Sequence, residues 1–102
     1  MNTTECQCFE SDTHIEWTDQ GDIGMTADYW DITHMRCATC GTPWLRAFFE
    51  IEAFARSSRH YRVPTTDAKL SGITPDAALL LIETAPFRIV GGSYYDGKEH
   101  RT

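Results

Sequence analysis

The stretch MRCATCGTPWL, residues 35–45, decides how this chain can fold. It contains a Cys-x-x-Cys motif formed by Cys37 and Cys40, and a glycine follows the motif directly. A second close pair, Cys6 and Cys8, lies nearer the N-terminus, and the chain has 4 cysteines in all. Two such pairs can form a metal site or disulfides, or one pair can act as a redox dithiol, and each choice imposes a different fold.

The spacing of the two pairs favours a tetrahedral zinc site. Each pair would bind the ion from one side, and the residues between them need only form a hairpin that brings the pairs together. Gly41 supports this interpretation, because a residue free to adopt a positive φ helps the chain turn tightly with its N–H groups aimed at the sulfurs. Four thiolates fill the tetrahedron, so the zinc would be structural rather than catalytic.

The stretch CATCGTPW, residues 37–44, resembles the knuckle of zinc-ribbon and related four-cysteine zinc domains. The resemblance covers roughly the first half of the chain. Its first pair is Cys-x-Cys, where the commoner ribbon has Cys-x-x-Cys, and the Lys/Arg-rich surface of ribbons that bind nucleic acid is missing. The resemblance implies that one structural Zn²⁺ is bound by four ligands: Cys6, Cys8, Cys37 and Cys40.

Other interpretations of the thiols stay open. A redox dithiol at Cys37 and Cys40 would favour a following helix, because a helix N-terminus lowers the pKa of a thiol. Disulfides between the two pairs would require an oxidising compartment, and the chain opens without an export signal. The four thiols could also be unrelated buried side chains. His14 or His34 could join the metal site, although such a histidine is more often a polar strand residue.

Charge is unevenly distributed in this chain of net charge −6. The first 35 residues contain no lysine or arginine and eight acids: Glu5, Glu10, Asp12, Glu16, Asp19, Asp22, Asp28 and Asp31. The next 27 residues contain five arginines: Arg36, Arg46, Arg56, Arg59 and Arg62. An acidic domain repels phosphate backbones, so the overall charge disfavours nucleic acid, although the central arginines leave room for a local basic patch.

Most of the chain is predicted to form β-strands. Aromatic and β-branched residues predict strands at 14–18 and 28–36, and a turn cluster at 19–24 separates them. Residues 44–54 fit a strand better than a helix, because alternation then gives one wholly apolar face: Leu45, Ala47, Phe49, Ile51 and Ala53. A turn at RSSR then leads to a strand at 60–63.

One helix is predicted at residues 75–85. Thr74 is placed to cap it, Pro75 suits its first position, and Asp76 is favoured at the positive end of the helix dipole. Pro86 follows the last turn, and a final strand at 87–90 precedes a glycine-rich end.

These patterns predict an α+β fold, namely a small antiparallel β-rich, zinc-stabilised domain with one helix near the C-terminus. Residues 1–102 would form a single domain, as expected for a chain of this length. Within it we expect a four-cysteine zinc-binding hairpin over 1–43, a β-hairpin, helix and final strand over 44–95, and a flexible tail over 96–102.

The function follows only as hypotheses. The chain has neither an apolar run long enough to span a membrane nor a signal-like start, so we expect a cytoplasmic protein without a membrane partner. The first hypothesis is a non-catalytic interaction module, of inhibitor or immunity type, whose acidic N-terminal half contacts a basic protein surface. A thiol-redox enzyme and a weak nucleic-acid binder are the alternatives. Charged side chains on neighbouring strands are expected to form exposed pairs rather than a catalytic site: Arg46, Glu50, Glu52, His60 and Arg62.

Overall fold

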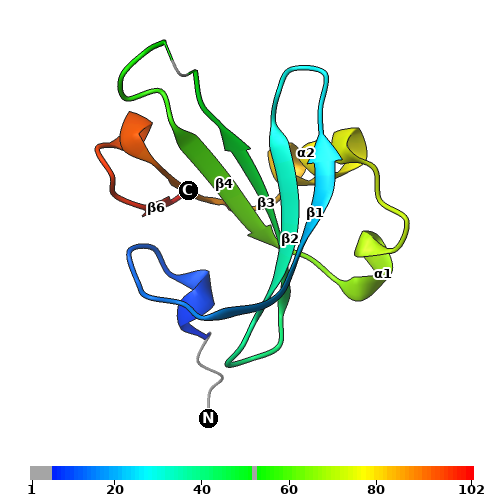
Figure 1. Cartoon of the computed structure of the whole chain (residues 1–102). Coiled ribbons are helices and arrows are strands. Elements are labelled where there is room, and N and C mark those ends of the chain that lie inside the picture. Colours follow the sequence, from blue (N-terminus) through cyan, green and yellow to red (C-terminus); the bar gives the residue numbers. More distant parts are fainter. Residues whose placement is uncertain (1–5, 52) are drawn as a thin grey trace.

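The structure is a computed structural model that describes residues 6–51 and 53–102. In this part of the chain six strands form one antiparallel sheet, with the strands side by side in sequence order (Figure 1). The strands are β1 (Trp17–Met25), β2 (Asp31–Cys37), β3 (Pro43–Phe49), β4 (Arg59–Pro64), β5 (Ile89–Gly91) and β6 (His100–Arg101). The helices are α1 (Asp67–Leu70) and α2 (Pro75–Thr84), with 3-10 turns η1 (Gln7–Phe9) and η2 (Ser93–Tyr95). The expected antiparallel, mostly β architecture is confirmed.

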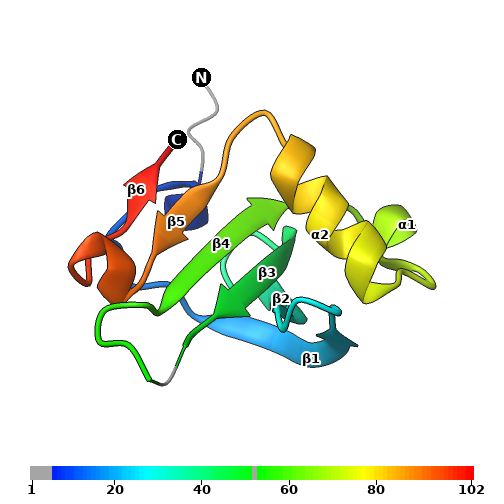
Figure 2. The same ribbon diagram turned by 90° about the horizontal axis from the view of Figure 1, so that it is seen from above.

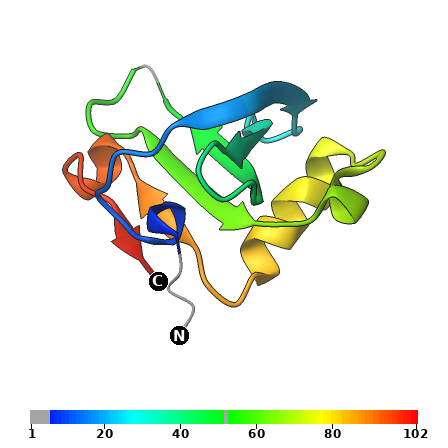
Figure 3. The same ribbon diagram turned by 90° about the horizontal axis from the view of Figure 1, so that it is seen from below.

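The two faces of the sheet carry separate apolar cores. Helix α2 covers one face (Figure 2), and the core beneath it consists of Ile32, Leu45, Ala47, Val63, Ala78 and Ile82. Side chains alternate between the faces of a strand, so other residues of the same strands build the second core. That core consists of Cys8, Met35, Cys37, Trp44 and Ile89. Its cysteines come from segments far apart in the sequence, and Figure 3 shows η1 beside β5 and β6, away from α2.

The first hairpin differs from its prediction. Residues 19–24, which were expected to form the turn, lie inside β1, and the chain reverses at 26–30 instead. The register between β1 and β2 shifts twice in this stretch, so β1 is a bulged strand. Gly21 lies at one shift, where a Cβ atom would come within 2.5 Å of His34 Nε2. The turn-forming residues therefore mark bulges and a close side-chain approach rather than the end of a strand.

Strand β3 ends earlier than predicted. It stops at Phe49, whereas the sequence pattern extended the strand to residue 54. Beyond it, the N–H of Ile51 donates to Ser57 Oγ at 2.9 Å, and the Ser57 hydroxyl donates to the Ile51 carbonyl at 2.8 Å. These local hydrogen bonds close a loop, so Ile51 is 37% exposed and does not extend the buried face.

Helix α2 spans Pro75–Thr84, compared with the predicted range 75–85. The Thr74 side chain accepts a hydrogen bond from the Ala77 N–H at 3.2 Å, which is the N-cap that the sequence indicated. The short helix α1 was not predicted. Among the described residues, no helix is both long and apolar enough to cross a membrane.

The C-terminal residues are held in the sheet. The predicted last strand at 87–90 appears as β5 at Ile89–Gly91, and residues 96–102, expected to be a flexible tail, contain β6, which pairs with β5. Asp12 and Glu99 bind each other reciprocally: the Asp12 N–H donates to Glu99 Oε1 at 3.0 Å, and the Glu99 N–H donates to Asp12 Oδ1 at 2.8 Å. This long-range contact, invisible in the local sequence, anchors the C-terminal segment.

Candidate metal centre

Four cysteine sulfurs lie together at one end of the sheet. All four Sγ atoms are within 4.8 Å of one another, with 3.7 Å between Cys6 and Cys37 and 3.6 Å between Cys8 and Cys40. Thiolates bound tetrahedrally at about 2.3 Å from a zinc ion are about 3.8 Å apart. The structure therefore brings the four predicted cysteines to separations at which they could hold one metal ion.

Each cysteine pair comes from a different local structure. Cys6 caps η1 and Cys8 lies within it, whereas Cys37 ends β2 and Cys40 lies in the turn to β3. In that turn the Gly41 N–H donates to the Cys37 carbonyl at 2.9 Å, and Gly41 adopts a φ of 78°. A side chain at this position would be strained, so the glycine allows the tight reversal that the sequence predicted.

The geometry disfavours the three other interpretations of the cysteines, which are disulfides, a redox dithiol and four unrelated buried thiols. All four cysteines are free, and sulfur separations of 3.6–3.7 Å are far longer than the bond of about 2.05 Å in a disulfide. Strand β3, rather than a helix, follows the Cys-x-x-Cys motif, so the helix N-terminus that would activate a redox dithiol is not at this position. The four sulfur atoms lie in one cluster, which argues against the interpretation as four unrelated buried side chains.

The surroundings of the sulfurs affect their protonation differently. Burial raises the pKa of Cys8, and hydrogen bonds with Cys40 and Cys37 raise it further. Partial burial acts to raise the pKa of Cys40 too, but hydrogen bonds with the Thr42 side chain and backbone outweigh it and lower this pKa to about 7. Cys40 Sγ lies 3.1 Å from Thr42 Oγ1. Metal binding requires thiolates, and of these two cysteines Cys40 is the one closer to the thiolate form near neutral pH.

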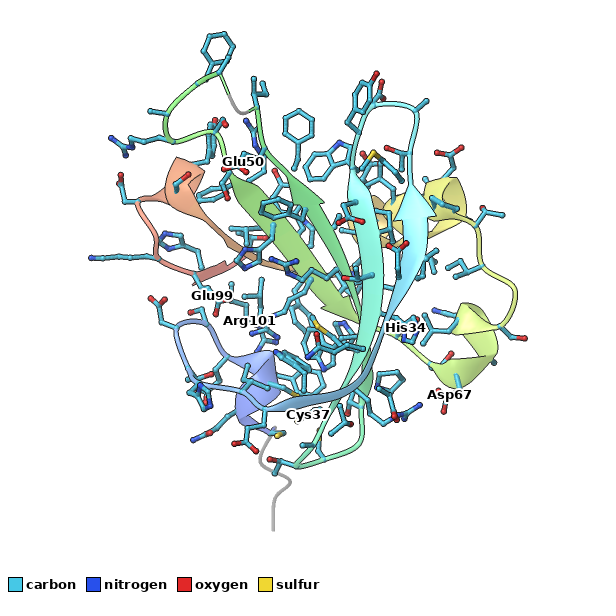
Figure 4. All side chains as sticks on the ribbon, viewed as in Figure 1. His34, Cys37, Glu50, Asp67, Glu99 and Arg101 are labelled. Carbon is cyan, nitrogen blue, oxygen red and sulfur yellow. The ribbon has the colours of Figure 1, made fainter. Side chains whose placement is uncertain are left out.

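Neither nearby histidine belongs to the cluster. Within residues 6–51 and 53–102, the candidate metal-binding group around these sulfurs consists of the four cysteines, without His14 or His34. His34 lies three residues before Cys37 on β2, so the two side chains point to opposite faces of the strand. Figure 4 shows His34 on the side of α1, away from Cys37.

Arg62 joins the cysteine-bearing N-terminal segment to the sheet. Its guanidinium donates to the carbonyls of Cys8 and Glu10, the latter at 3.2 Å. It also lies over the rings of Trp17 and Trp44, with centroid distances of 5.3 and 4.8 Å. Burial lowers the pKa of Arg62, which is only 3% exposed. The sequence pattern predicted an exposed charge pair here, whereas the structure shows a buried cation that ties the N-terminal segment to the sheet.

The remaining central arginines do not gather into one basic patch. Arg36 pairs with Asp19 at 3.5 Å and with Asp67 at 2.5 Å, and Arg56 pairs with Asp96. These contacts spread the positive charge over several elements, which weakens the nucleic-acid hypothesis. Of the predicted charge pairs, Glu50 lies beyond the end of β3 (Figure 4), and Glu52 lies outside the described residues.

Glu99 should make stability depend on pH in the acid range. Its hydrogen bond with His60, 3.2 Å between Nε2 and Oε2, holds the pKa of Glu99 below 4.5 despite partial burial. A lowered carboxyl pKa stabilises the fold above the unfolded-state pKa, and this contribution disappears as the pH falls through the folded-state pKa. We therefore expect Glu99→Gln to lower stability near neutral pH and to flatten the loss of stability below about pH 4.5.

Urea denaturation at several pH values between about 6 and 3 measures this effect. The exposed Glu83→Gln variant on α2 is the control and should keep the wild-type slope. If the free energy of unfolding fell equally steeply with decreasing pH in the wild type and in Glu99→Gln, Glu99 would be ruled out as the source of the pH dependence.

The fold and the site together define an antiparallel β-sheet protein with a four-cysteine centre that could hold one metal ion, consistent with a zinc-knuckle-like site. Comparisons of the chain with protein-family models, with curated proteins and with solved structures gave no significant match. The functional proposal therefore depends on the geometry and charges of the described residues.

Proposed function

We propose that this protein binds one structural zinc ion and acts as a protein-interaction module, of inhibitor or immunity type, through the acidic surface of its N-terminal half. The observation that carries the proposal is the unneutralised acidic charge on and beside the outer strand β1. The four-cysteine centre has a supporting role, because it holds the N-terminal segment against the sheet.

The donor set favours zinc in a structural role. Four sulfur ligands in a tetrahedral arrangement are typical of zinc or of iron–sulfur centres, and zinc is the metal of most closed four-cysteine sites in small domains. With four thiolates bound, no position stays open for a catalytic water. Cys8 and Cys37 are buried and belong to the second core, so metal binding is coupled to the packing around Trp44.

The first test of this proposal is metal content. Protein purified under reducing conditions without added metal should contain about one zinc per chain, and X-ray absorption should show sulfur-only ligation at about 2.3 Å. Elemental analysis measures the stoichiometry and distinguishes zinc from iron. A folded, reduced sample free of metal, or one that contains mainly iron, would overturn the zinc assignment.

The acidic surface lies on and beside strand β1, which forms one edge of the sheet. Glu16, Asp22 and Asp28 are exposed and have no ion-pair partner in the described part of the chain, whereas Asp19 is neutralised by Arg36. Charges of one sign on an edge strand discourage aggregation through that edge and accelerate encounter with an oppositely charged surface. A basic protein surface is therefore the partner chemistry that this edge favours.

Charge reversal tests the interaction directly. The double variant Glu16→Lys/Asp22→Lys should weaken capture of a basic protein from the native lysate at least tenfold, because it reverses the local field on β1. The effect should fade above about 0.15 M salt, where the screening length is about 8 Å. Asp12 and Asp19 are left unchanged, because they bind Glu99 and Arg36 within the fold.

Matched controls make the result specific. Glu50→Lys/Glu83→Lys produces the same change in net charge at exposed positions outside strand β1 and should leave capture unchanged. Both variants should retain their metal. If capture of the basic protein changed neither with the charge reversal on β1 nor with salt, the acidic edge would not take part in the interaction.

A thiol-redox function is the second candidate, favoured by the exposed position of Cys40. In that case Cys37 and Cys40 would be free of metal in the purified protein, and they would reduce a model disulfide such as that of insulin while forming a disulfide with each other. The metal analysis separates the two candidates, because thiolates held by zinc are not available for this exchange.

A further inference from the structure

The face of the sheet opposite α2 contains a cavity of about 550 Å³. Its walls come from β1–β4 and from the segment before β6, and they include Trp17, Met35, Arg46, His60 and Glu99. This volume falls within the range of about 300–1,000 Å³ that is typical of small-molecule sites. The metal centre and the acidic edge do not account for these residues, so the cavity needs its own explanation.

Two arginines lie directly opposite each other in the cavity wall. Arg46 of β3 and Arg62 of β4 are register partners, so their side chains project from the same face of the sheet. Like charges in directly opposed positions are unfavourable. The positive charge and the N–H donors of Arg62 are compensated, because Arg62 donates to two backbone carbonyls and lies 3.7 Å from Glu99 Oε1.

Arg46 has no comparable compensation. Within residues 6–51 and 53–102 it makes neither a hydrogen bond nor an ion pair, and its guanidinium lies over the Phe48 ring at 5.3 Å. Burial lowers the pKa of Arg46, and the more distant charges of Asp31 and Glu99 oppose that shift. Arg46 is half-buried, and its guanidinium N–H donors have no acceptor among the described residues, so they are available to a ligand in the cavity. An anionic ligand in the cavity would supply both the missing acceptors and the missing charge.

The rest of the wall indicates what kind of anion fits. Arg46 and Arg62 against Glu99 leave one net positive charge when His60 is neutral, which suits a single negative charge. Trp17 and Met35 provide apolar wall beside these polar groups. The planar guanidinium of Arg46 matches a carboxylate, with which it can form two parallel hydrogen bonds. Figure 4 shows Glu99 on the far side of the sheet from His34, next to Arg101.

We propose that this cavity binds a small organic monocarboxylate, whose carboxylate pairs with Arg46 and whose apolar or aromatic body packs against Trp17 and Met35. The site lies beside the acidic edge, because β1 contributes Trp17 to its wall, and it predicts a small-molecule ligand in addition to any protein partner. Glu99 and its partner His60 then form the boundary of the site, and the Glu99 carboxylate offsets one of the two arginine charges.

Titration of the metal-loaded protein with simple probes tests the proposal. Benzoate should bind saturably with a dissociation constant of about 1 mM or tighter, as observed by NMR shifts or calorimetry. Benzamide, which has the same shape without the charge, should bind at least tenfold more weakly, and acetate, which lacks the body, should also bind more weakly. Inorganic phosphate that binds as tightly as benzoate would indicate a general anion site and would overturn the carboxylate assignment.

Two variants connect the binding to Arg46. Arg46→Gln should weaken benzoate binding at least tenfold, whereas Arg59→Gln, which removes an arginine that stacks on Tyr94 outside the cavity, should not change it. Because Arg46 is uncompensated in the free protein, Arg46→Gln should also keep or raise the melting temperature. No saturable benzoate binding, unchanged binding by Arg46→Gln, or a lowered melting temperature with binding intact would each overturn the proposal.

Discussion

Replacing Cys37 with serine should abolish metal binding and remove most of the free energy of unfolding. Cys37 is 2% exposed and belongs to both the sulfur cluster and the second core, so its loss affects ligation and packing together. Structural zinc sites contribute about 10–16 kcal/mol in peptide systems, which is comparable with the whole stability of about 5–15 kcal/mol expected for a domain. Metal analysis and thermal unfolding followed by circular dichroism measure both effects.

Three comparisons make this result interpretable. Cys40→Ser also removes a sulfur ligand, but at an exposed position, so it should lose the metal with a smaller packing defect. Treatment of the wild type with a strong chelator should reproduce the metal-free unfolding curve, and His34→Ala should retain the metal. If His34→Ala lost the metal while Cys6→Ser kept it, the assignment of Cys6 rather than His34 as a ligand would be wrong.

Replacing Arg62 with leucine should lower the free energy of unfolding by about 3–5 kcal/mol, as is typical when one partner of a buried ionic network is removed. The variant leaves the carbonyls of Cys8 and Glu10 without their donor and removes the guanidinium that lies 3.7 Å from Glu99 Oε1. It also removes the guanidinium that lies over the Trp17 and Trp44 rings. Urea denaturation at neutral pH measures the change, and the affinity for zinc should fall in parallel.

Arg59→Leu is the matched control for Arg62→Leu. Arg59 lies on the same strand and stacks on the Tyr94 ring at 4.1 Å, but it is half-buried and, among the described residues, makes no hydrogen bond or ion pair with the N-terminal segment. Its loss should cost about 1 kcal/mol or less. A cost for Arg62→Leu no larger than for Arg59→Leu would contradict the role assigned to Arg62.

The sequence by itself indicated the features that depend on neighbouring residues. The spacing of the cysteine pairs limited how they could meet, and Gly41 marked the tight turn, because the positive φ it adopts is a local property. Thr74 and Pro75 marked the start of a helix for the same reason, since capping involves residues within one turn. Local chemistry therefore located the candidate metal ligands and the helix start.

Strand boundaries were less predictable, because local propensity competes with pairing. The glycines and acids of residues 19–24 have turn propensity, but pairing with β2 and two register shifts keep them in a strand. At the end of β3 local interactions prevailed over strand pairing. The hydrogen bonds between Ile51 and Ser57 close a loop there, although the alternating apolar residues favour a strand. Neither outcome can be derived from hydrophobic periodicity alone.

Only the tertiary structure decided which charged residues are buried and what they contact. Arg62 reaches the carbonyl of Cys8 across 54 residues, and Asp12 meets Glu99 across 87 residues. Arg46 lies in a cavity wall because β3 and β4 pair in one register, which a shift of one residue would reverse. The physical reason is that burial and electrostatic compensation depend on groups brought together by folding, whereas sequence patterns report only on residues that are close along the chain.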